Sequence, residues 1–121
     1  RTETLAAQRR AMLAASLDPG EPVQAGRETP QGRLTWQILV RNDGRLLRNG
    51  ALPTLIQWEG VHPAARMPDA GLALQSLTLN GVPATARELL GLRHVQVQSG
   101  LGPALAATLV TPSGTVILES P

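Results

Sequence analysis

The chain has 121 residues, of which 42% are hydrophobic and 17% charged, a balance typical of a folded domain and too apolar for a disordered segment. All eleven basic residues are scattered arginines and the net charge is only +2, so we expect no nucleic-acid partner and attribute the lysine-free composition to a GC-rich bacterial genome. No long apolar run, signal peptide or cysteine is evident. We therefore expect no membrane partner, no disulfide and no thiolate chemistry, and a cytoplasmic location.

One helix and three strands are expected in the first half of the chain. Apolar residues recur at helical spacing over residues 2–16, where Thr2 or Thr4 can cap the start and Asp18-Pro19-Gly20 ends the helix. The segment 45–51, with two arginines and a glycine, is expected to be a loop. Runs rich in β-branched and aromatic residues, bounded by turn formers, predict strands over residues 21–28, 33–41 and 52–59.

The second half is expected to hold four strands and one helix, after a proline-rich connector over residues 61–71. Proline second and glycine fourth in Thr111-Pro112-Ser113-Gly114 are typical of a type I turn, so the last two strands should form a hairpin. Proline near the first turn and Gly91 near the end favour a short helix over residues 83–92. The strands are predicted over residues 72–80, 94–98, 104–110 and 115–119.

The order of these elements suggests an α+β fold made of two related units. Residues 72–121 have the order βαβββ, and residues 1–60 have αβββ, with the first strand of the first unit missing. We therefore expect a single domain over residues 1–121 that is part of a longer protein. Neither half has enough apolar surface to be stable alone, so the strands of both units should form a cupped mixed sheet with the helices outside.

Several stretches carry a resemblance to a known family. They are GEPVQAGRE, RLTWQILV, LLRNGALPTLIQWEG, HPAARMPDAGLALQSL and ATLVTPSGTVIL. With the tandem βαβββ order, they make the chain similar to the glyoxalase-like branch of the vicinal oxygen chelate superfamily, which includes glyoxalases, bleomycin-resistance proteins and dioxygenases. The resemblance implies a concave sheet that binds a ligand, often with a divalent metal held by His, Gln or Glu on the first and last strands of the units.

Carried onto this chain, the resemblance implies Gln57, Gln75 and Glu119 as candidate metal ligands. Gln57 stands where an acidic residue is expected, and Glu119 lies two positions beyond the best-aligned residue, Ile117, on the same face of its strand. Neither histidine has the spacing of a metal-binding pair. The alternative interpretation, that these three are solvated strand residues and no metal is bound, is preferred.

Four residues are candidates for contacting a substrate: Trp36, Trp58, His62 and Arg66. Each also has a structural interpretation. The two tryptophans can fill the core of a chain that has no Phe or Tyr, and His62 before Pro63 can fix a turn. Arg66 can hold an anionic group or remain solvated. The three aspartates all lie in turn-like segments, where they are common for local reasons.

The sequence thus predicts a glyoxalase-like domain that binds a small polar or anionic molecule in a concave sheet, with metal-assisted lyase, isomerase or dioxygenase chemistry left open. The alternative is a non-catalytic ligand-binding or dimerisation scaffold of the same fold, and a homodimer is compatible with either. The faces on which Gln57, Gln75 and Glu119 lie should discriminate between them, because convergence on one polar concavity favours an enzyme.

Overall fold

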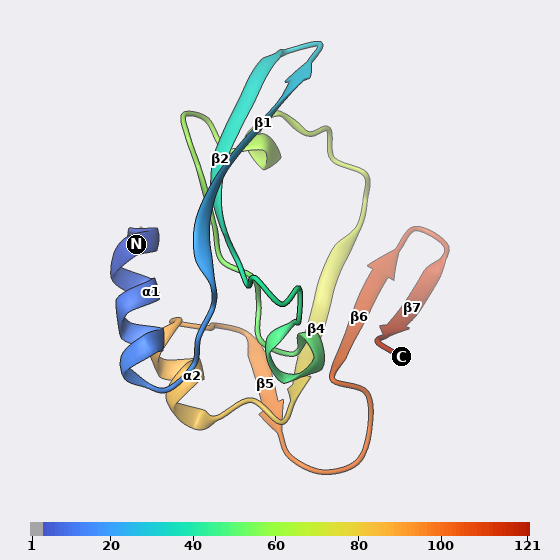
Figure 1. The fold of residues 1–121 in the computed structure, drawn as a ribbon. Helices are drawn as coiled ribbons and strands as arrows, with labels where there is room; N and C mark the ends of the chain where they lie inside the picture. Colours follow the sequence, from blue (N-terminus) through green and yellow to red (C-terminus); the bar gives the residue numbers. More distant parts are fainter. Residues whose placement is uncertain (1–3) are drawn as a thin grey trace. The chain divides into compact units, whose positions relative to one another are not determined.

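The computed structural model describes residues 4–121 and divides into two compact units (Figure 1). Unit 1 contains the described residues up to Arg45 together with Thr54–Pro68, and unit 2 contains Leu46–Pro53 and Asp69–Pro121. Each unit has one α-helix and one β-sheet, so the α+β class expected from the sequence is confirmed. Within residues 4–121, no helix is long and apolar enough to cross a membrane.

Unit 1 consists of a helix followed by three antiparallel strands. Thr4 caps the helix by accepting a hydrogen bond from the Ala7 N–H at 3.3 Å, whereas Thr2 lies outside the described residues. The strands pair in chain order, β1-β2-β3. The elements are α1 (Leu5–Ala14), β1 (Glu21–Thr29), β2 (Gly32–Val40) and β3 (Ile56–Trp58).

The third strand of unit 1 is shorter than the expected strand over residues 52–59. Leu52 is buried and belongs to unit 2. Pro53 has no N–H to donate to a strand ladder. The regular strand consequently begins only at Ile56, and the preceding loop contains a short 3-10 helix, η1 (Leu47–Gly50).

The strand register gives the sheet of unit 1 two different faces. We call one the aromatic face, because Ala25, Trp36 and Trp58 form a row across its three strands. We call the other the glutamine face, since Gln24, Gln37 and Gln57 form the neighbouring row and alternate residues of a strand point to opposite sides. The aromatic face also carries the row Val23, Ile38 and Ile56, and the glutamine face carries the buried Leu39.

Unit 2 has a mixed four-stranded sheet in the order β5-β4-β6-β7. The first two strands of the unit are parallel and are joined through α2, while the remaining pairs are antiparallel. Its elements are β4 (Ala73–Asn80), α2 (Ala84–Leu89), β5 (Val95–Gln98), β6 (Leu105–Thr111) and β7 (Gly114–Glu119), close to the expected ranges. The connector before this unit contains a second 3-10 helix, η2 (Pro63–Arg66), which belongs to unit 1. Each sheet is open, and neither closes into a barrel within residues 4–121.

The same type of tight hairpin turn occurs in both units. The β1–β2 turn is Thr29-Pro30-Gln31-Gly32, and the β6–β7 turn is Thr111-Pro112-Ser113-Gly114, as expected for the latter. In each, the threonine hydroxyl donates to the glycine carbonyl, at 2.6 Å from Thr29 and 2.8 Å from Thr111. The glycines have φ angles of 112° and 122°, which favour glycine over residues with a side chain.

Candidate functional site

A pocket of about 300 Å³ lies beside β3 in unit 1. It includes three of the residues singled out from the sequence: Gln57, Trp58 and His62. None of the lining residues is an acid or an arginine, so the pocket is uncharged apart from the imidazole, and its apolar and aromatic surface is interrupted by two amides. It is lined by Leu5 and Gln8 of α1, by Ile56, Gln57 and Trp58 of β3, and by Gly60 and His62 of the following loop.

Gln57 takes part in the start of the helix. Its side-chain oxygen Oε1 accepts a hydrogen bond from the Leu5 N–H at 2.8 Å. The first N–H groups of a helix have no partner within the helix, so this bond satisfies one of them. The amide oxygen that would bind a metal is therefore engaged with backbone, and Gln57 serves to hold α1 against β3.

Two aromatic rings of the pocket, Trp58 and His62, continue a row that begins at Trp36, outside the pocket lining. Trp36 and Trp58 are cross-strand neighbours with ring centroids 5.0 Å apart and tilted by 49°. The Trp58 ring meets His62 edge-on, with centroids 5.9 Å apart. Both tryptophans are only half-buried, so they form part of an accessible face and do not fill a closed core.

The orientation of His62 follows from its backbone contact. Its Nδ1 accepts a hydrogen bond from the Ala64 N–H at 3.1 Å, and the residue caps the 3-10 helix η2. The turn-fixing role expected from the sequence is thus present. Because Nδ1 is an acceptor, the hydrogen of the neutral ring is on Nε2, which is left to donate to a bound molecule.

Arg66 lies apart from these residues. Its Nη1 donates to the Gln31 carbonyl at 3.2 Å, which ties η2 to the turn between β1 and β2. It does not line the β3 pocket. Of the four sequence-predicted substrate residues, Trp58 and His62 line the pocket, Trp36 lies against Trp58 outside the lining, and Arg66 is engaged with the β1–β2 turn.

Gln75 and Glu119 do not converge in unit 2. Gln75 lies at an irregularity in the β4–β6 register, between Leu74 and Ser76. Glu119 ends β7 and is in register with Thr78 across the intervening strand β6. With strands about 4.8 Å apart and about 3.3 Å per residue, the two positions differ by about 10 Å across the sheet and about 10 Å along it. Glu119 does share the strand face of Ile117, as expected.

These positions do not fit a divalent metal within either unit. A metal would need several oxygen or nitrogen donors at one point, whereas the oxygen of Gln57 caps a helix and the other two candidates are apart. Among residues 4–121 there is no group of three His, Asp or Glu side chains arranged to hold a metal ion. We derive no metal-assisted step from them.

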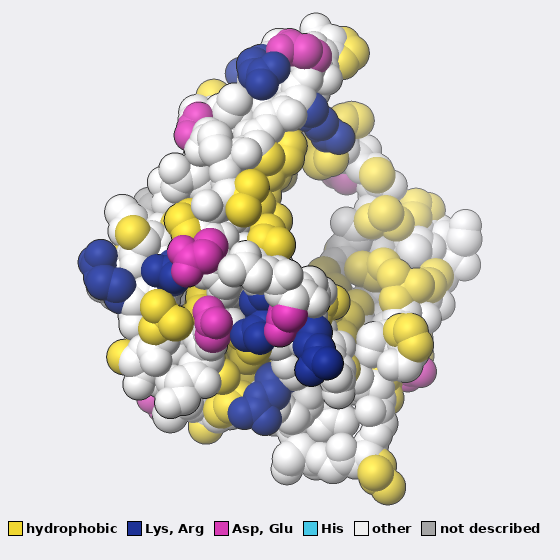
Figure 2. All heavy atoms as spheres, in the orientation of Figure 1, with side chains coloured by type: hydrophobic (Ala, Val, Ile, Leu, Met, Phe, Trp, Pro, Cys, Tyr) yellow, Lys and Arg dark blue, Asp and Glu magenta, His cyan; other side chains and the backbone are white. Residues whose placement is uncertain are grey.

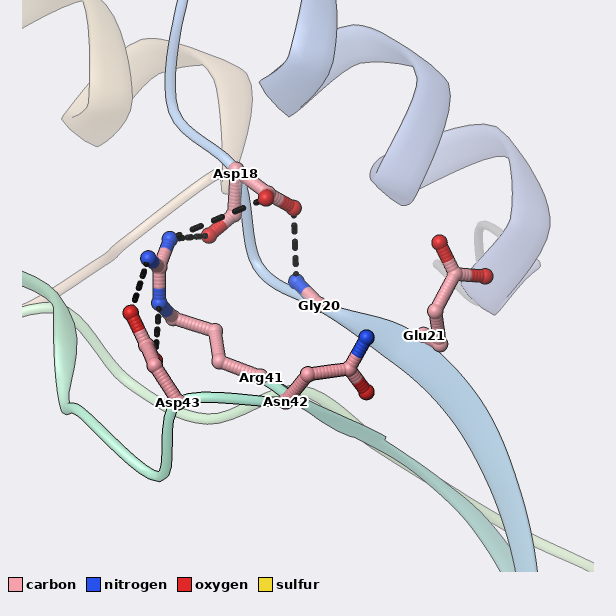
Figure 3. Close-up of a pocket in the computed structure, with 6 residues that line it drawn as sticks. All are labelled: Asp18, Gly20, Glu21, Arg41, Asn42 and Asp43. Carbon is pink, nitrogen blue, oxygen red and sulfur yellow. Dashed lines mark hydrogen bonds and ion pairs between the residues drawn. The ribbon is translucent and has the colours of Figure 1, made fainter.

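A second pocket, of about 200 Å³, surrounds Arg41 at the end of β2 (Figure 3). The guanidinium forms a bidentate pair with Asp43, with Nε–Oδ1 and Nη2–Oδ2 distances of 3.0 and 2.6 Å, and its Nη1 donates to the Asp18 carbonyl at 3.0 Å. Glu21, also in this pocket, pairs instead with Arg9. The charged groups thus satisfy one another and join the loop before β1 to the end of β2.

Electrostatics agree with that structural role. The hydrogen bonds from Arg41 hold the pKa of Asp43 well below its usual range, with a further contribution from the Arg45 N–H. The same pair raises the pKa of Arg41. The sequence placed Asp18 and Asp43 in turns but did not connect them with Arg41. The sequence did contain a signal for the Arg41–Asp43 pair, because the two residues are two positions apart and directly follow a strand.

On the glutamine face, Glu59 is held by two neutral donors. The Thr35 hydroxyl donates to one carboxylate oxygen at 2.6 Å, and the Gln24 amide donates to the other at 2.9 Å. These bonds lower the pKa of Glu59. They favour its ionised form, so Glu59 acts as a fixed acceptor across three strands and is not suited to donate a proton.

The fold and site define an α+β chain with two open sheets and a small pocket at a sheet edge, lined by apolar and aromatic side chains with a few polar groups. Residues 1–92 match the model of the glyoxalase-like domain family. The chain therefore belongs to this family, within the vicinal oxygen chelate superfamily, as the sequence resemblance indicated. The matched region ends before β5, β6 and β7. No curated protein and no solved structure matches the chain.

Proposed function

We propose that this glyoxalase-like domain binds a small, polar, uncharged molecule in the β3 pocket of unit 1. The observation that supports this most directly is that the Trp58 and His62 rings meet edge-on in a pocket of about 300 Å³ at the β3 edge, the lower end of the range for small-molecule sites. The Trp58 ring offers an apolar surface, and the Nε2–H of His62 donates to an oxygen of the ligand.

The charge of the pocket selects the class of ligand. The lining residues include amides and an imidazole but no acid or arginine, and Arg66 is engaged with the Gln31 carbonyl instead. A carboxylate or phosphate placed in this pocket would lose its hydration without gaining a guanidinium partner. Small compounds with hydroxyl and carbonyl oxygens are therefore favoured over strongly anionic ones.

The test compares a neutral probe, dihydroxyacetone, with its anionic counterpart, lactate. Both tryptophans lie in unit 1, so tryptophan fluorescence reports on this pocket and not on unit 2. We expect dihydroxyacetone to change the fluorescence saturably and to bind more tightly than lactate. The proposal is wrong if neither compound changes the signal, or if lactate binds more tightly.

A matched pair of variants locates the binding. His62→Asn keeps an acceptor able to cap η2 but removes the ring, and should weaken dihydroxyacetone binding at least fivefold. His94→Asn makes the same change in unit 2, where the φ of 58° is one that asparagine tolerates, and should leave binding unchanged. Equal losses in both variants would show that the binding site is elsewhere.

A further inference from the structure

The sheets of the two units present four edge strands, and they differ in how well they are protected from pairing with another chain. Edge strands expose unpaired N–H and C=O groups, and proteins usually shorten them or place charges and prolines on them. The strands β3 and β5 have only three and four residues. The strand β1 contains Pro22 and the charged residues Glu21, Arg27 and Glu28.

The strand β7 has none of these protections before its last residue. Its six residues contain no proline and no charge except Glu119. Three consecutive aliphatic residues are exposed: Val116 at 42%, Ile117 at 63% and Leu118 at 54%. Because successive side chains point to opposite faces, apolar surface is exposed on both sides of this edge. Figure 2 shows hydrophobic side chains gathered over the β6–β7 hairpin.

The hydrogen-bond pattern identifies which backbone groups of β7 face outward. The Ser120 N–H donates to the Leu105 carbonyl at 2.8 Å, and the register continues from there with Leu118 opposite Ala107. In an antiparallel ladder, only alternate residues exchange hydrogen bonds with the neighbouring strand. The N–H and C=O groups of Thr115, Ile117 and Glu119 therefore point to the open edge, where no other strand of residues 4–121 pairs with β7.

We propose that β7 pairs antiparallel with β7 of a second copy of this chain, around a two-fold axis at Ile117. In this register Ile117 faces Ile117 of the partner subunit, and Thr115 faces Glu119 of the partner subunit. All three outward-facing residues of each strand are then used, and each facing pair exchanges two hydrogen bonds. The pairing joins the two four-stranded sheets into one continuous sheet.

Charge and side-chain complementarity favour this register over its alternatives. An axis at Glu119 would place two carboxylates directly opposite each other, which is destabilising. With the axis at Ile117, each carboxylate lies opposite a threonine hydroxyl, and Val116 packs against Leu118 of the partner subunit. Registers shifted toward either end of β7 leave some outward-facing residues without a partner. The inference is independent of the ligand proposed for unit 1.

The oligomeric state of the protein in solution tests the interface. We expect a dimer by light scattering after size exclusion. Ile117→Lys should give a monomer with an unchanged circular dichroism spectrum, because it places two lysines at the axis without altering the bonds to β6. Gln96→Lys, an exposed change on β5 at the other edge of the same sheet, should remain a dimer. A monomeric wild type, or a dimeric Ile117→Lys, would overturn the proposal.

Cysteine variants test the register itself, since the natural chain contains no cysteine. Val116 and Leu118 of the partner subunit form a non-hydrogen-bonded pair in the proposed register, with Cα atoms about 4.5 Å apart, within the range of a disulfide. An oxidised mixture of Val116→Cys and Leu118→Cys chains should therefore yield a covalent heterodimer, whereas neither variant alone should cross-link. Equal cross-linking of the single variants, or none in the mixture, contradicts the register.

Discussion

The two units share the order helix, strand, strand, strand, yet they pair these strands differently. In unit 1, β1 and β2 lie side by side along nine register pairs. In unit 2 the corresponding strands β5 and β6 are separated by β4, which precedes the helix in the chain. A common order of elements therefore does not imply a common sheet topology. The lengths of the connections account for the difference.

Two residues join β1 to β2, and such a short connection forces neighbouring antiparallel strands. Six residues, 99–104, join β5 to β6. They can span about 20 Å when extended, at about 3.3 Å per residue, whereas passing over one strand requires about 10 Å. Asn80, the last residue of β4, donates from Nδ2 to the Gly100 and Gly102 carbonyls, and so fixes this loop where it passes the end of β4.

The largest expected effect on stability is at Gly20 of unit 1. We compare it with Gly81 of unit 2, a second glycine with a positive φ angle. A Cβ at Gly20 would lie 2.2 Å from the backbone carbonyl of Val40, and its φ is 95°. Gly20→Ala should therefore destabilise unit 1 by about 3 kcal/mol or more, because β1 and β2 would have to separate. Gly81 has φ 76° and nothing within 4 Å of its Cβ position, so Gly81→Ala should cost only about 1 to 2 kcal/mol.

Urea unfolding followed by tryptophan fluorescence measures the Gly20→Ala effect, since both tryptophans lie in unit 1. Circular dichroism follows Gly81→Ala in the same experiment. Equal shifts of the urea midpoint in the two variants would mean that the close approach of the Val40 backbone does not determine the structure at the start of β1.

The two Thr-Pro-x-Gly hairpins should respond alike despite their different sheets. Nothing lies within 4 Å of a Cβ at either Gly32 or Gly114. The backbone strain at φ 112° and 122° is therefore the main consequence of an alanine. We expect each substitution to lower the free energy of unfolding by about 1 to 2 kcal/mol, as measured by urea denaturation. A difference between them larger than about 1 kcal/mol would indicate that the sheets, and not the turns, control these positions.

Asn80→Leu tests the loop that distinguishes unit 2. Asn80 is only 8% exposed, and its Oδ1 is buried without a hydrogen-bond partner among residues 4–121. Removing that oxygen partly offsets the loss of the two Nδ2 bonds, so we expect a net destabilisation of only about 1 kcal/mol. Gln98→Leu, at the exposed neighbouring position on β5, should change stability by less than about 0.5 kcal/mol. Circular dichroism in urea compares the two, and a larger loss in Gln98→Leu would exclude the loop-fixing role.

Local patterns allowed most of the secondary structure to be predicted. The helical spacing of apolar residues placed α1, and alternating apolar residues with proline-glycine turns placed β1, β2 and the β6–β7 hairpin. Which strands become neighbours is set by connection length and tertiary pairing, and side-chain periodicity carries no information on it. The six-residue connection permits β4 to lie between β5 and β6 but does not require it, so this insertion could not be predicted. The β1–β2 turn repeats the Thr-Pro-x-Gly pattern of the β6–β7 turn, a signal that is visible in the sequence.

The candidate site was predicted less completely, for a related reason. Trp58 and His62 are four residues apart, so a short turn brings them together, and the sequence identified both. The family resemblance made Gln57 a candidate metal ligand, with a solvated strand residue as the preferred interpretation, whereas its contact is with the Leu5 N–H, which is far away in the chain. Pairing of Arg41 with Asp18 likewise depends on a long-range contact, unlike its pairing with Asp43.

The smallest expected effect is on the pH dependence of stability below the ordinary pKa of aspartate. We compare two aspartates that lie in turns, one from each unit. Asp43 in unit 1 binds Arg41, and its ionised form is favoured in the folded state, so its folded pKa lies below the ordinary value of 3.8. Below that value the unfolded chain binds more protons than the folded one, and stability falls as the pH decreases. The contribution is fully present above the ordinary pKa and is lost as the pH falls toward the folded pKa.

Asp43→Asn should therefore flatten the decrease in the urea midpoint below about pH 4, while keeping an oxygen that accepts the Arg45 N–H. Asp69 in unit 2 accepts the Gly71 N–H in a similar turn, and Asp69→Asn is the matched control for replacing a turn aspartate that is not in contact with Arg41. The difference between the two variants should shrink in high salt, because the Arg41–Asp43 pair is accessible to solvent and is screened. Identical slopes for both variants would show that the Arg41 pair does not link unit 1 stability to pH.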